Sequence, residues 1–110
     1  MENVTVFAPI RLAQGKTEAD LLAASAVFQR EFVDLEPGVL RRELVRKPDG
    51  SYLDIVQFRS AQDYEEVTRK EMQSPVCAAF FAVMDMSTAE EDMAAMEVMV
   101  SLESHVRGAG

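Results

Sequence analysis

Several residue types are scarce in this sequence, and each scarcity excludes a class of protein. Among the 110 residues there is no tryptophan, one cysteine and one histidine. The single cysteine, Cys77, cannot form an internal disulfide, and one cysteine with one histidine is too little for a structural zinc site. The five glycines never form a loop that could cradle a nucleotide phosphate, so flavin and nicotinamide sites are not expected. We therefore expect no cofactor and no metal.

Basic residues are also few, because 11 lysines and arginines stand against 19 aspartates and glutamates, for a formal net charge of -8. Acidic side chains repel phosphates, so nucleic acid and anionic membranes are not expected as partners. The longest apolar run, VCAAFFAVM, is too short for a bilayer span, and the N-terminal residues do not resemble a signal peptide. The sequence predicts a soluble, cytoplasmic protein with one domain over residues 1–110.

The first half of the chain has clear patterns of secondary structure. Residues 3–13 alternate between apolar and polar side chains, which is typical of a strand. Thr17 and Asp20 have the spacing of a capping box, and the helix that they begin should reach about Leu35. Two further strands, GVLRRELVRK and SYLDIVQFRS, are joined by a Pro-Asp-Gly turn. The basic run in the first of these strands favours an edge position that charge protects against further pairing.

The second half of the chain is less regular. Ser60 with Asp63 predicts the start of a second helix, and the Ser-Pro pair at residues 74–75 ends that helix and opens a third. The third helix should reach about Met84 and is apolar all round, so we expect it to be buried. The segment after Asp85 is ambiguous, since its composition favours a helix while its later part alternates. We predict a strand at about residues 95–103.

This order of elements, β-α-β-β-α-(α)-β, predicts an α+β, ferredoxin-like fold. In such a fold a four-stranded antiparallel sheet carries its helices on one face. The bare face keeps apolar side chains whichever alternation points outward, for example Phe7 or Val6, and Val56 or Ile55. A contiguous apolar patch on a small domain usually marks an association surface. We therefore predict a homodimer with sheet packed on sheet, and the alternative is a monomer with a mixed outer face.

The central residues resemble a known family. The segment PGVLRRELVRKPDGSYLDIVQFRSAQDYEEVTRKEMQSPVCAAFF, residues 37–81, is similar to the middle of an antibiotic biosynthesis monooxygenase. In that family a Pro-Gly strand, a hairpin and a strand ending in an aromatic residue lead through a serine into a helix that closes near Ser-Pro. The resemblance implies a dimeric α/β barrel. It also implies cofactor-independent oxidation of a small aromatic substrate such as a quinol.

The chain departs from the family's pattern at two positions. Phe58 stands where a tryptophan often ends the third strand, and Glu71 stands where the next helix often has a histidine. Haem-degrading relatives are expected to use that histidine with a tryptophan and an asparagine, and the only asparagine here is Asn3. Haem degradation is therefore not expected. The alternative to a monooxygenase is a non-catalytic barrel that binds a small hydrophobic ligand or assists a pathway.

Glu71 is the candidate catalytic residue. On a helical wheel it falls among the core-facing residues of the second predicted helix, which are Ala61, Tyr64, Val67, Thr68 and Met72. A carboxylate on that face must reach water, find a cationic partner or become protonated. In the simpler interpretation, Glu71 extends into solvent or accepts an N–H near Ser74. In the functional interpretation, it is an acid or base facing a ligand between helices and sheet.

Six further residues are candidates for ligand binding, and each has a structural alternative: Arg11, Phe28, Phe58, Tyr64, Phe80 and His105. Arg11 could hold a carboxylate or phenolate, or pair with an acid such as Asp54. Tyr64 could donate a hydrogen bond from its hydroxyl to a ligand, or be a core residue whose hydroxyl reaches solvent. The phenylalanines could line an aromatic site or simply form the core. His105 would contribute only if the C-terminal tail folded back.

Overall fold

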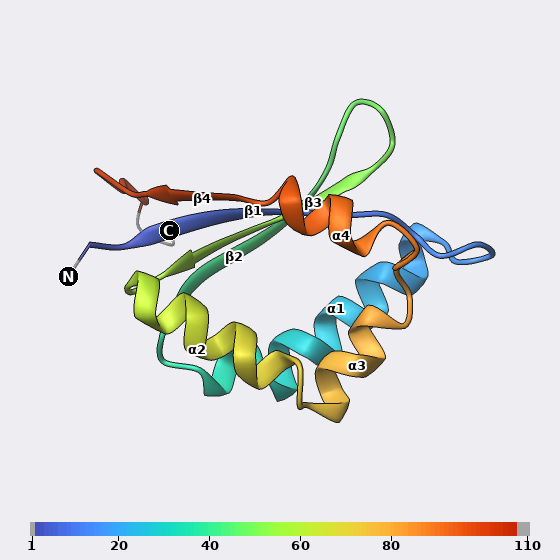
Figure 1. Cartoon of the computed structure of the whole chain (residues 1–110), viewed down its shortest axis with the longest axis horizontal. Helices are drawn as coiled ribbons and strands as arrows, with labels where there is room; N and C mark the ends of the chain where they lie inside the picture. Colours follow the sequence, from blue (N-terminus) through green and yellow to red (C-terminus); the bar gives the residue numbers. More distant parts are fainter. Residues whose placement is uncertain (1, 108–110) are drawn as a thin grey trace.

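The computed structural model describes residues 2–107, and its sheet confirms the predicted fold class (Figure 1). Three helices, α1 (Glu18–Glu31), α2 (Ala61–Glu71) and α3 (Pro75–Phe81), lie on one face of a four-stranded antiparallel sheet. The strands are β1 (Val4–Ile10), β2 (Val39–Arg46), β3 (Tyr52–Phe58) and β4 (Glu97–Val100), in the order β2-β3-β1-β4. The prediction that the basic strand is an edge strand is confirmed, because β2 is outermost.

Local signals start the first two helices and form the hairpin turn as predicted. The backbone N–H of Asp20 donates to the Thr17 hydroxyl at 3.2 Å, and the Thr17 N–H donates to the Asp20 carboxylate at 2.9 Å. This capping box starts α1. At α2 the Ser60 hydroxyl accepts the Asp63 N–H at 3.1 Å. In the β2–β3 turn, Gly50 adopts a φ of 88°, a conformation that glycine accepts readily.

Gly38 has a packing role that its place before β2 did not suggest. A Cβ at this position would lie 2.9 Å from both Cβ and Cγ of Asp63, closer than side-chain carbons can approach. The Asp63 side chain cannot easily move away, since its carboxylate also binds Arg59 at 2.8 Å and Ser60 at 2.9 Å. Gly38 therefore lets the first turn of α2 pack against the chain that enters β2.

Two predictions for the helices are wrong in detail. The first helix ends at Glu31, because Phe32 leaves helical geometry with a φ of -129°, and a short 3-10 helix, η1 (Val33–Leu35), follows. Leu35 is 71% exposed, so it does not help to cover the sheet. The third helix ends at Phe81, and it is buried only on the side of Cys77 and Phe80. Its other side is exposed because no further layer covers it.

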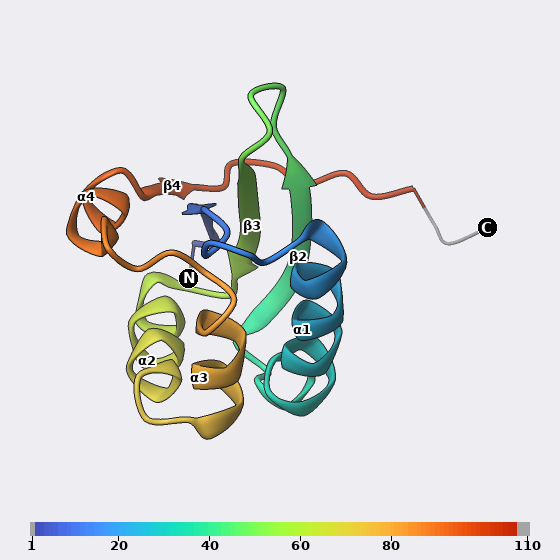
Figure 2. The same ribbon diagram turned by 90° about the vertical axis from the view of Figure 1, so that its right-hand side faces the viewer.

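The segment after Asp85 contains both of the structures that its pattern suggested. A short helix, α4 (Ala89–Ala94), comes first, and β4 then spans only Glu97–Val100, which is shorter than the predicted strand. β4 pairs with β1 from Val4 opposite Val100 to Phe7 opposite Glu97. Figure 2 shows α4 beside the β4 edge, apart from the three helices that cover the sheet.

The core lies between the sheet and helices α1, α2 and α3. Strand β1 turns Val4, Val6 and Ile10 toward the helices, and these side chains are no more than 4% exposed. The helices contribute Leu21, Phe28, Val67, Cys77 and Phe80. The opposite face of the sheet has no helix over it within residues 2–107 (Figure 1). In this described part of the chain, no helix is long and apolar enough to cross a membrane.

Candidate functional site

A buried ion pair joins the two strands at the β2 edge of the sheet. Nε of Arg42 donates to Oδ2 of Asp54 at 2.9 Å, and the two side chains are 6% and 9% exposed. Arg42 lies opposite Val56 and Asp54 lies opposite Leu44, so the pair runs diagonally across the strands. Both side chains point toward the helices. Two charges removed from water this completely are uncommon outside functional sites and structural ion pairs.

Aromatic rings from two helices lie against the Arg42 guanidinium. Its central carbon is 4.9 Å from the ring centre of Phe28 in α1 and 5.3 Å from that of Phe80 in α3. The two rings stack on each other with centroids 4.5 Å apart. Arg42 also donates through Nη1 to the side-chain oxygen of Gln29 at 3.4 Å. Cation–π contacts of this kind stabilise a desolvated guanidinium and fix its orientation.

Glu71 is the last residue of α2, and its half-buried side chain faces the same region. The pKa of Glu71 is raised from its ordinary value of 4.5 to about 7. Burial is the main cause, the negative charge of Asp54 adds to it, and the positive charge of Arg42 opposes it. The Ser74 N–H donates to the backbone carbonyl of Glu71 at 3.4 Å, not to its carboxylate. A carboxyl group that is about half ionised at neutral pH can both take and give a proton.

We call Arg42, Asp54 and Glu71 the buried polar cluster. Within residues 2–107, Nη2 of Arg42 and Oδ1 of Asp54 are buried and have no hydrogen-bond partner. Burial also raises the pKa of Asp54, against the opposing effect of Arg42. Buried polar atoms without a partner cost stability, and for that reason they are rare in native proteins. A bound water or a ligand group would supply the missing partners.

The structure brings some of the predicted residues together and separates others. Phe28 and Phe80 lie against the buried polar cluster, on the side of Arg42. Phe58 and Tyr64 contact each other edge to face at 5.3 Å and belong to the same hydrophobic core as Phe28 and Phe80, but neither contacts Arg42 through its ring. The suggested pairing of Arg11 with Asp54 is wrong. Arg11 is 60% exposed and lies 3.5 Å from Asp92, while Asp54 is held by Arg42.

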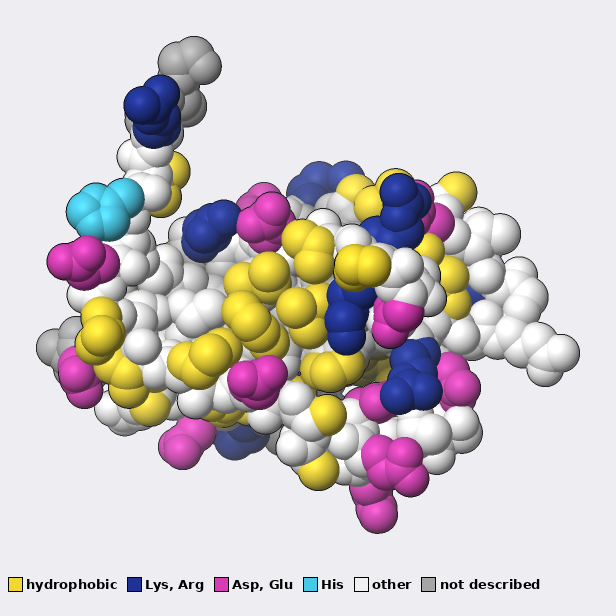
Figure 3. Space-filling view, turned by 90° about the horizontal axis from the view of Figure 1, so that it is seen from above, with side chains coloured by type: hydrophobic (Ala, Val, Ile, Leu, Met, Phe, Trp, Pro, Cys, Tyr) yellow, Lys and Arg dark blue, Asp and Glu magenta, His cyan; other side chains and the backbone are white. Residues whose placement is uncertain are grey.

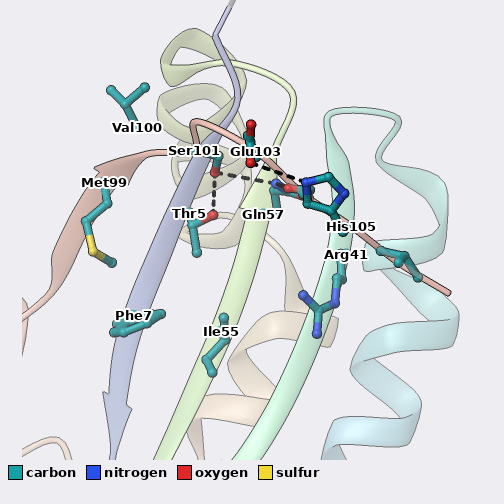
Figure 4. A pocket seen from close by; sticks show the side chains of 12 residues that line it. Thr5, Phe7, Arg41, Ile55, Gln57, Met99, Val100, Ser101, Glu103 and His105 are labelled. Atoms are coloured by element: carbon teal, nitrogen blue, oxygen red, sulfur yellow. Dashed lines mark hydrogen bonds and ion pairs between the residues drawn. The ribbon is translucent and has the colours of Figure 1, made fainter.

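His105 lies on the other face of the sheet. The chain after β4 returns across that face, where Gln57 donates to the Ser104 hydroxyl at 2.8 Å and Thr5 contacts Ser101 at 2.6 Å. His105 borders a groove of about 380 Å³ on this face, and no member of the buried polar cluster lines the groove (Figure 4). The His105 side chain is 85% exposed and is 3.3 Å from Glu103. His105 and Glu71 are therefore not parts of one site.

Sequence reasoning missed Arg42 and Asp54 as site residues, although a signal for each was present. In strand β3, Asp54 is in phase with Tyr52, Val56 and Phe58, so an acid shares the apolar phase. In strand β2, Arg42 is in phase with Leu44. A charge in the apolar phase of a strand predicts a buried charge that needs a partner. Among the described residues, no group of three or more histidine, cysteine, aspartate or glutamate side chains is arranged to hold a metal.

Comparisons with known proteins show the fold of this chain. No protein-family model matches it, and no curated protein matches its sequence. SnoaB from Streptomyces nogalater, a cofactor-independent oxygenase, aligns with a TM-score of 0.64 and 16% identity over 98% of this chain and 99% of that chain. A candidate antibiotic biosynthesis monooxygenase from Caulobacter crescentus CB15 aligns with a TM-score of 0.66 and 18% identity, over 93% of this chain and 92% of that one.

A third similar structure carries a different activity. The hydroxynitrile lyase of Passiflora edulis aligns with a TM-score of 0.58 and 14% identity, over 96% of this chain and 98% of the lyase. The resemblance to antibiotic biosynthesis monooxygenases is thus confirmed at the level of the fold. Because an oxygenase and a lyase share this fold, the reaction depends on the residues of the site.

Proposed function

We propose that the chain is an antibiotic biosynthesis monooxygenase-like protein that oxidises a small reduced aromatic compound without a cofactor. The observation that carries this proposal is Glu71, a carboxyl group with a pKa raised to about 7 beside a buried arginine. A general base is most effective when its pKa lies near the working pH. An adjacent cation stabilises the negative charge that develops on the substrate oxygen.

The proposed reaction assigns a role to each group. Glu71 removes a proton from the activated carbon of an anthrone-type substrate, and Arg42 stabilises the resulting oxyanion. The electron-rich substrate itself then reduces O₂. Overall, a CH₂ group becomes a carbonyl: one oxygen atom enters the substrate, and the other leaves as water with the two hydrogens of that CH₂ group. Because the substrate supplies the electrons, the protein needs only to bind, deprotonate and orient it.

The substrate approaches the cluster over the end of α2. Glu71 is the half-buried member of the cluster, whereas Arg42 and Asp54 are almost fully covered. The neighbouring Met72 is 80% exposed, so this corner of the molecule is open to solvent. A flat ring entering here meets the carboxyl group first and the guanidinium with its phenylalanines behind it. The prediction that Met72 faces the core is wrong, because Met72 follows the last turn of α2 as its C-cap.

Oxygen uptake with a panel of quinols and anthrones tests the proposal. We expect wild-type activity to rise through pH 7 as Glu71 ionises, and Glu71→Gln to lower the rate by about 10²- to 10⁴-fold, the usual contribution of a general base. Glu66→Gln is the matched control, because Glu66 lies on the exposed side of the same helix, 3.5 Å from Arg69. Uptake that is the same in wild type and in Glu71→Gln would contradict the role of Glu71.

A non-catalytic ligand-binding barrel is the second candidate function. The contacts of Phe28 and Phe80 with Arg42 support it, since apolar rings around a single polar group are typical of ligand-binding sites. This function predicts that a small hydrophobic ligand stays bound through purification and is seen by mass spectrometry, while no substrate in the panel consumes oxygen. Turnover of any panel member above the uncatalysed rate would exclude it.

We also propose that two copies pack sheet on sheet. Phe7, Ile55 and Met99 line the groove on the outer face, and apolar side chains gather at the centre of that face (Figure 3). Arg41 and Glu43 form a charged pair at 2.8 Å on β2, which places polar groups beside the apolar area. An apolar centre with a polar rim is the usual anatomy of a protein interface.

The cytoplasmic location stays a prediction.

Light scattering coupled to size exclusion measures this association. We expect the mass of a dimer for the wild type and the mass of a monomer for Ile55→Glu, because the new charge would be buried against the partner sheet. Leu22→Glu is the matched control. Leu22 is 54% exposed on α1, on the helical side of the molecule, so this variant should stay dimeric. A monomeric wild type at micromolar concentration would overturn the dimer.

A further inference from the structure

The two buried atoms without a partner are complementary in kind. Nη2 of Arg42 can only donate a hydrogen bond, and Oδ1 of an ionised Asp54 can only accept one. They belong to side chains that are already joined through Nε and Oδ2 at 2.9 Å, so one small group could meet both. A hydroxyl group both accepts and donates, whereas a carbonyl, an ether or a carboxylate only accepts.

The charge of the buried polar cluster also selects the ligand. Arg42 contributes one positive charge and Asp54 one negative charge, and Glu71 adds further negative charge as it ionises. With Asp54 ionised, the net charge of the cluster lies between zero and minus one, depending on the ionisation of Glu71. An anionic ligand would gain from Arg42 but would meet repulsion from both carboxylates in a region where water screens little. A neutral ligand avoids that repulsion.

The side chains beside Arg42 are aromatic, and both are almost fully buried. Phe28 and Phe80 lie within 5.3 Å of its guanidinium carbon, on the helix side of the ion pair. Their faces already meet each other and Arg42, so a ligand ring beside Arg42 packs against their edges. We propose that Arg42 and Asp54 together determine specificity by anchoring the hydroxyl group of a neutral aromatic ligand, with Arg42 donating to its oxygen and Asp54 accepting its proton.

This inference rests on the proposed function, because it places the ligand in the same site. It adds that Arg42 and Asp54 act as a pair and that the ligand binds as a neutral hydroxyl compound. The oxyanion that Arg42 stabilises in the proposed reaction forms only after Glu71 has removed a proton. A different arrangement is possible in which the guanidinium turns slightly and binds both Asp54 oxygens. In that arrangement Nη2 and Oδ1 satisfy each other, so a ligand hydroxyl gains little from them, and the two arrangements predict different binding preferences.

Three unreactive probes distinguish them in the wild-type protein near pH 7: naphthalene, 2-naphthol and 2-naphthoate. They share one ring system and differ in carrying no polar group, a neutral hydroxyl or an anion. Isothermal titration calorimetry should show 2-naphthol binding about 10- to 100-fold tighter than naphthalene, which is the effect of hydrogen bonds to charged partners. The 2-naphthoate should bind more weakly than 2-naphthol.

The double variant Arg42→Met/Asp54→Leu removes both polar groups at similar volume. Such a replacement of a buried ion pair is often neutral or stabilising, so the variant should fold. We expect it to bind 2-naphthol and naphthalene equally well. Arg46→Met is the matched control, because Arg46 is on the same strand and 65% exposed. It should keep the wild-type preference.

A second measurement does not depend on the folding of a variant. In wild-type protein with ¹⁵N-labelled arginine, 2-naphthol should shift the Nε resonance of Arg42 and leave that of Arg46 unchanged. Equal affinity for naphthalene and 2-naphthol, or tightest binding of 2-naphthoate, would overturn the inference, as would a preference that survives in the double variant. So would the absence of binding by all three probes.

The outcomes separate this inference from the proposed function. Oxygen uptake that depends on Glu71, without any preference for the hydroxyl probe, rejects the inference and supports the oxidation. A clear preference for 2-naphthol that the double variant loses, without oxygen uptake, supports the inference and favours the ligand-binding function. The two measurements use different ligands, so neither result determines the other.

Discussion

Two arginines of β2 each hold a carboxylate at 2.9 Å, yet they lie in very different surroundings. Arg42 and Asp54 are 6% and 9% exposed, whereas Arg46 and Glu18 are 65% and 40% exposed. Arg42 lies beneath the rings of α1 and α3, and Arg46 lies at the end of the strand beside the first turn of α1. The two ion pairs therefore differ in energy although their distances are equal, because water screens the charges of Arg46 and Glu18 but not those of Arg42 and Asp54.

The comparison extends to the groups around each pair. Glu18 also accepts a hydrogen bond from the Tyr52 hydroxyl at 3.1 Å, so the exposed pair belongs to a satisfied network with solvent beside it. The inner pair instead leaves Nη2 and Oδ1 without partners within the described residues. Water can satisfy any remaining donor or acceptor of the exposed network. A group that met both atoms would stabilise the inner pair.

Removing the inner arginine should give the largest effect. Arg42→Gln leaves Asp54 buried without its cation, and we expect a loss of about 3 to 5 kcal/mol in the free energy of unfolding. Urea denaturation followed by circular dichroism measures this loss. A decrease below about 1 kcal/mol would mean that water reaches Asp54, and the inner pair would then resemble the outer one.

Removing the acid of Glu71 should give an intermediate effect that depends on pH. The folded pKa of about 7 lies above the ordinary value of 4.5, so the folded protein binds the extra proton between these limits and loses stability as pH rises through them. At pH 8, Glu71→Gln should raise the free energy of unfolding by up to about 3 kcal/mol relative to wild type. Below pH 4.5 that pH-dependent gain should disappear.

Urea denaturation at several pH values tests the Glu71 prediction, with Glu66→Gln as the control. Glu66 is on the exposed side of α2 beside Arg69, so its replacement should show no comparable pH-dependent gain. A Glu71→Gln gain that stays constant from pH 4 to pH 8 would show that the carboxyl group does not titrate in the folded protein near pH 7. In that case Glu71 would be unsuited to act as a base.

Removing the outer arginine should give the smallest effect. Arg46→Gln breaks an exposed pair, for which we expect a loss of about 1 kcal/mol or less. Salt should reduce this loss further, because mobile ions screen surface charges. Denaturation at low and high salt measures both features. A loss as large as that of Arg42→Gln would show that the end of β2 is structurally more important than its exposure suggests.

The sequence alone determined the features that depend on neighbouring residues. The capping box at Thr17, the cap at Ser60 and the turn at Gly50 all formed as predicted, because each needs only groups within a few residues. The alternating strands and their order also defined the fold class. The ends of α1 and β4 were predicted less well, since they depend on what packs against the last turn and on which edge a strand finds.

Tertiary structure decided which face of each strand is inside. Alternation assigns residues to two faces but does not say which face the helices cover. In β2 the pairing register also shifts between Val39 and Arg41, so the position of Arg42 could not be counted from the start of the strand. The helical period placed Glu71 on the core side. Its raised pKa needs burial beside Asp54 of β3, and residues this far apart in the chain meet only after the helices have packed on the sheet.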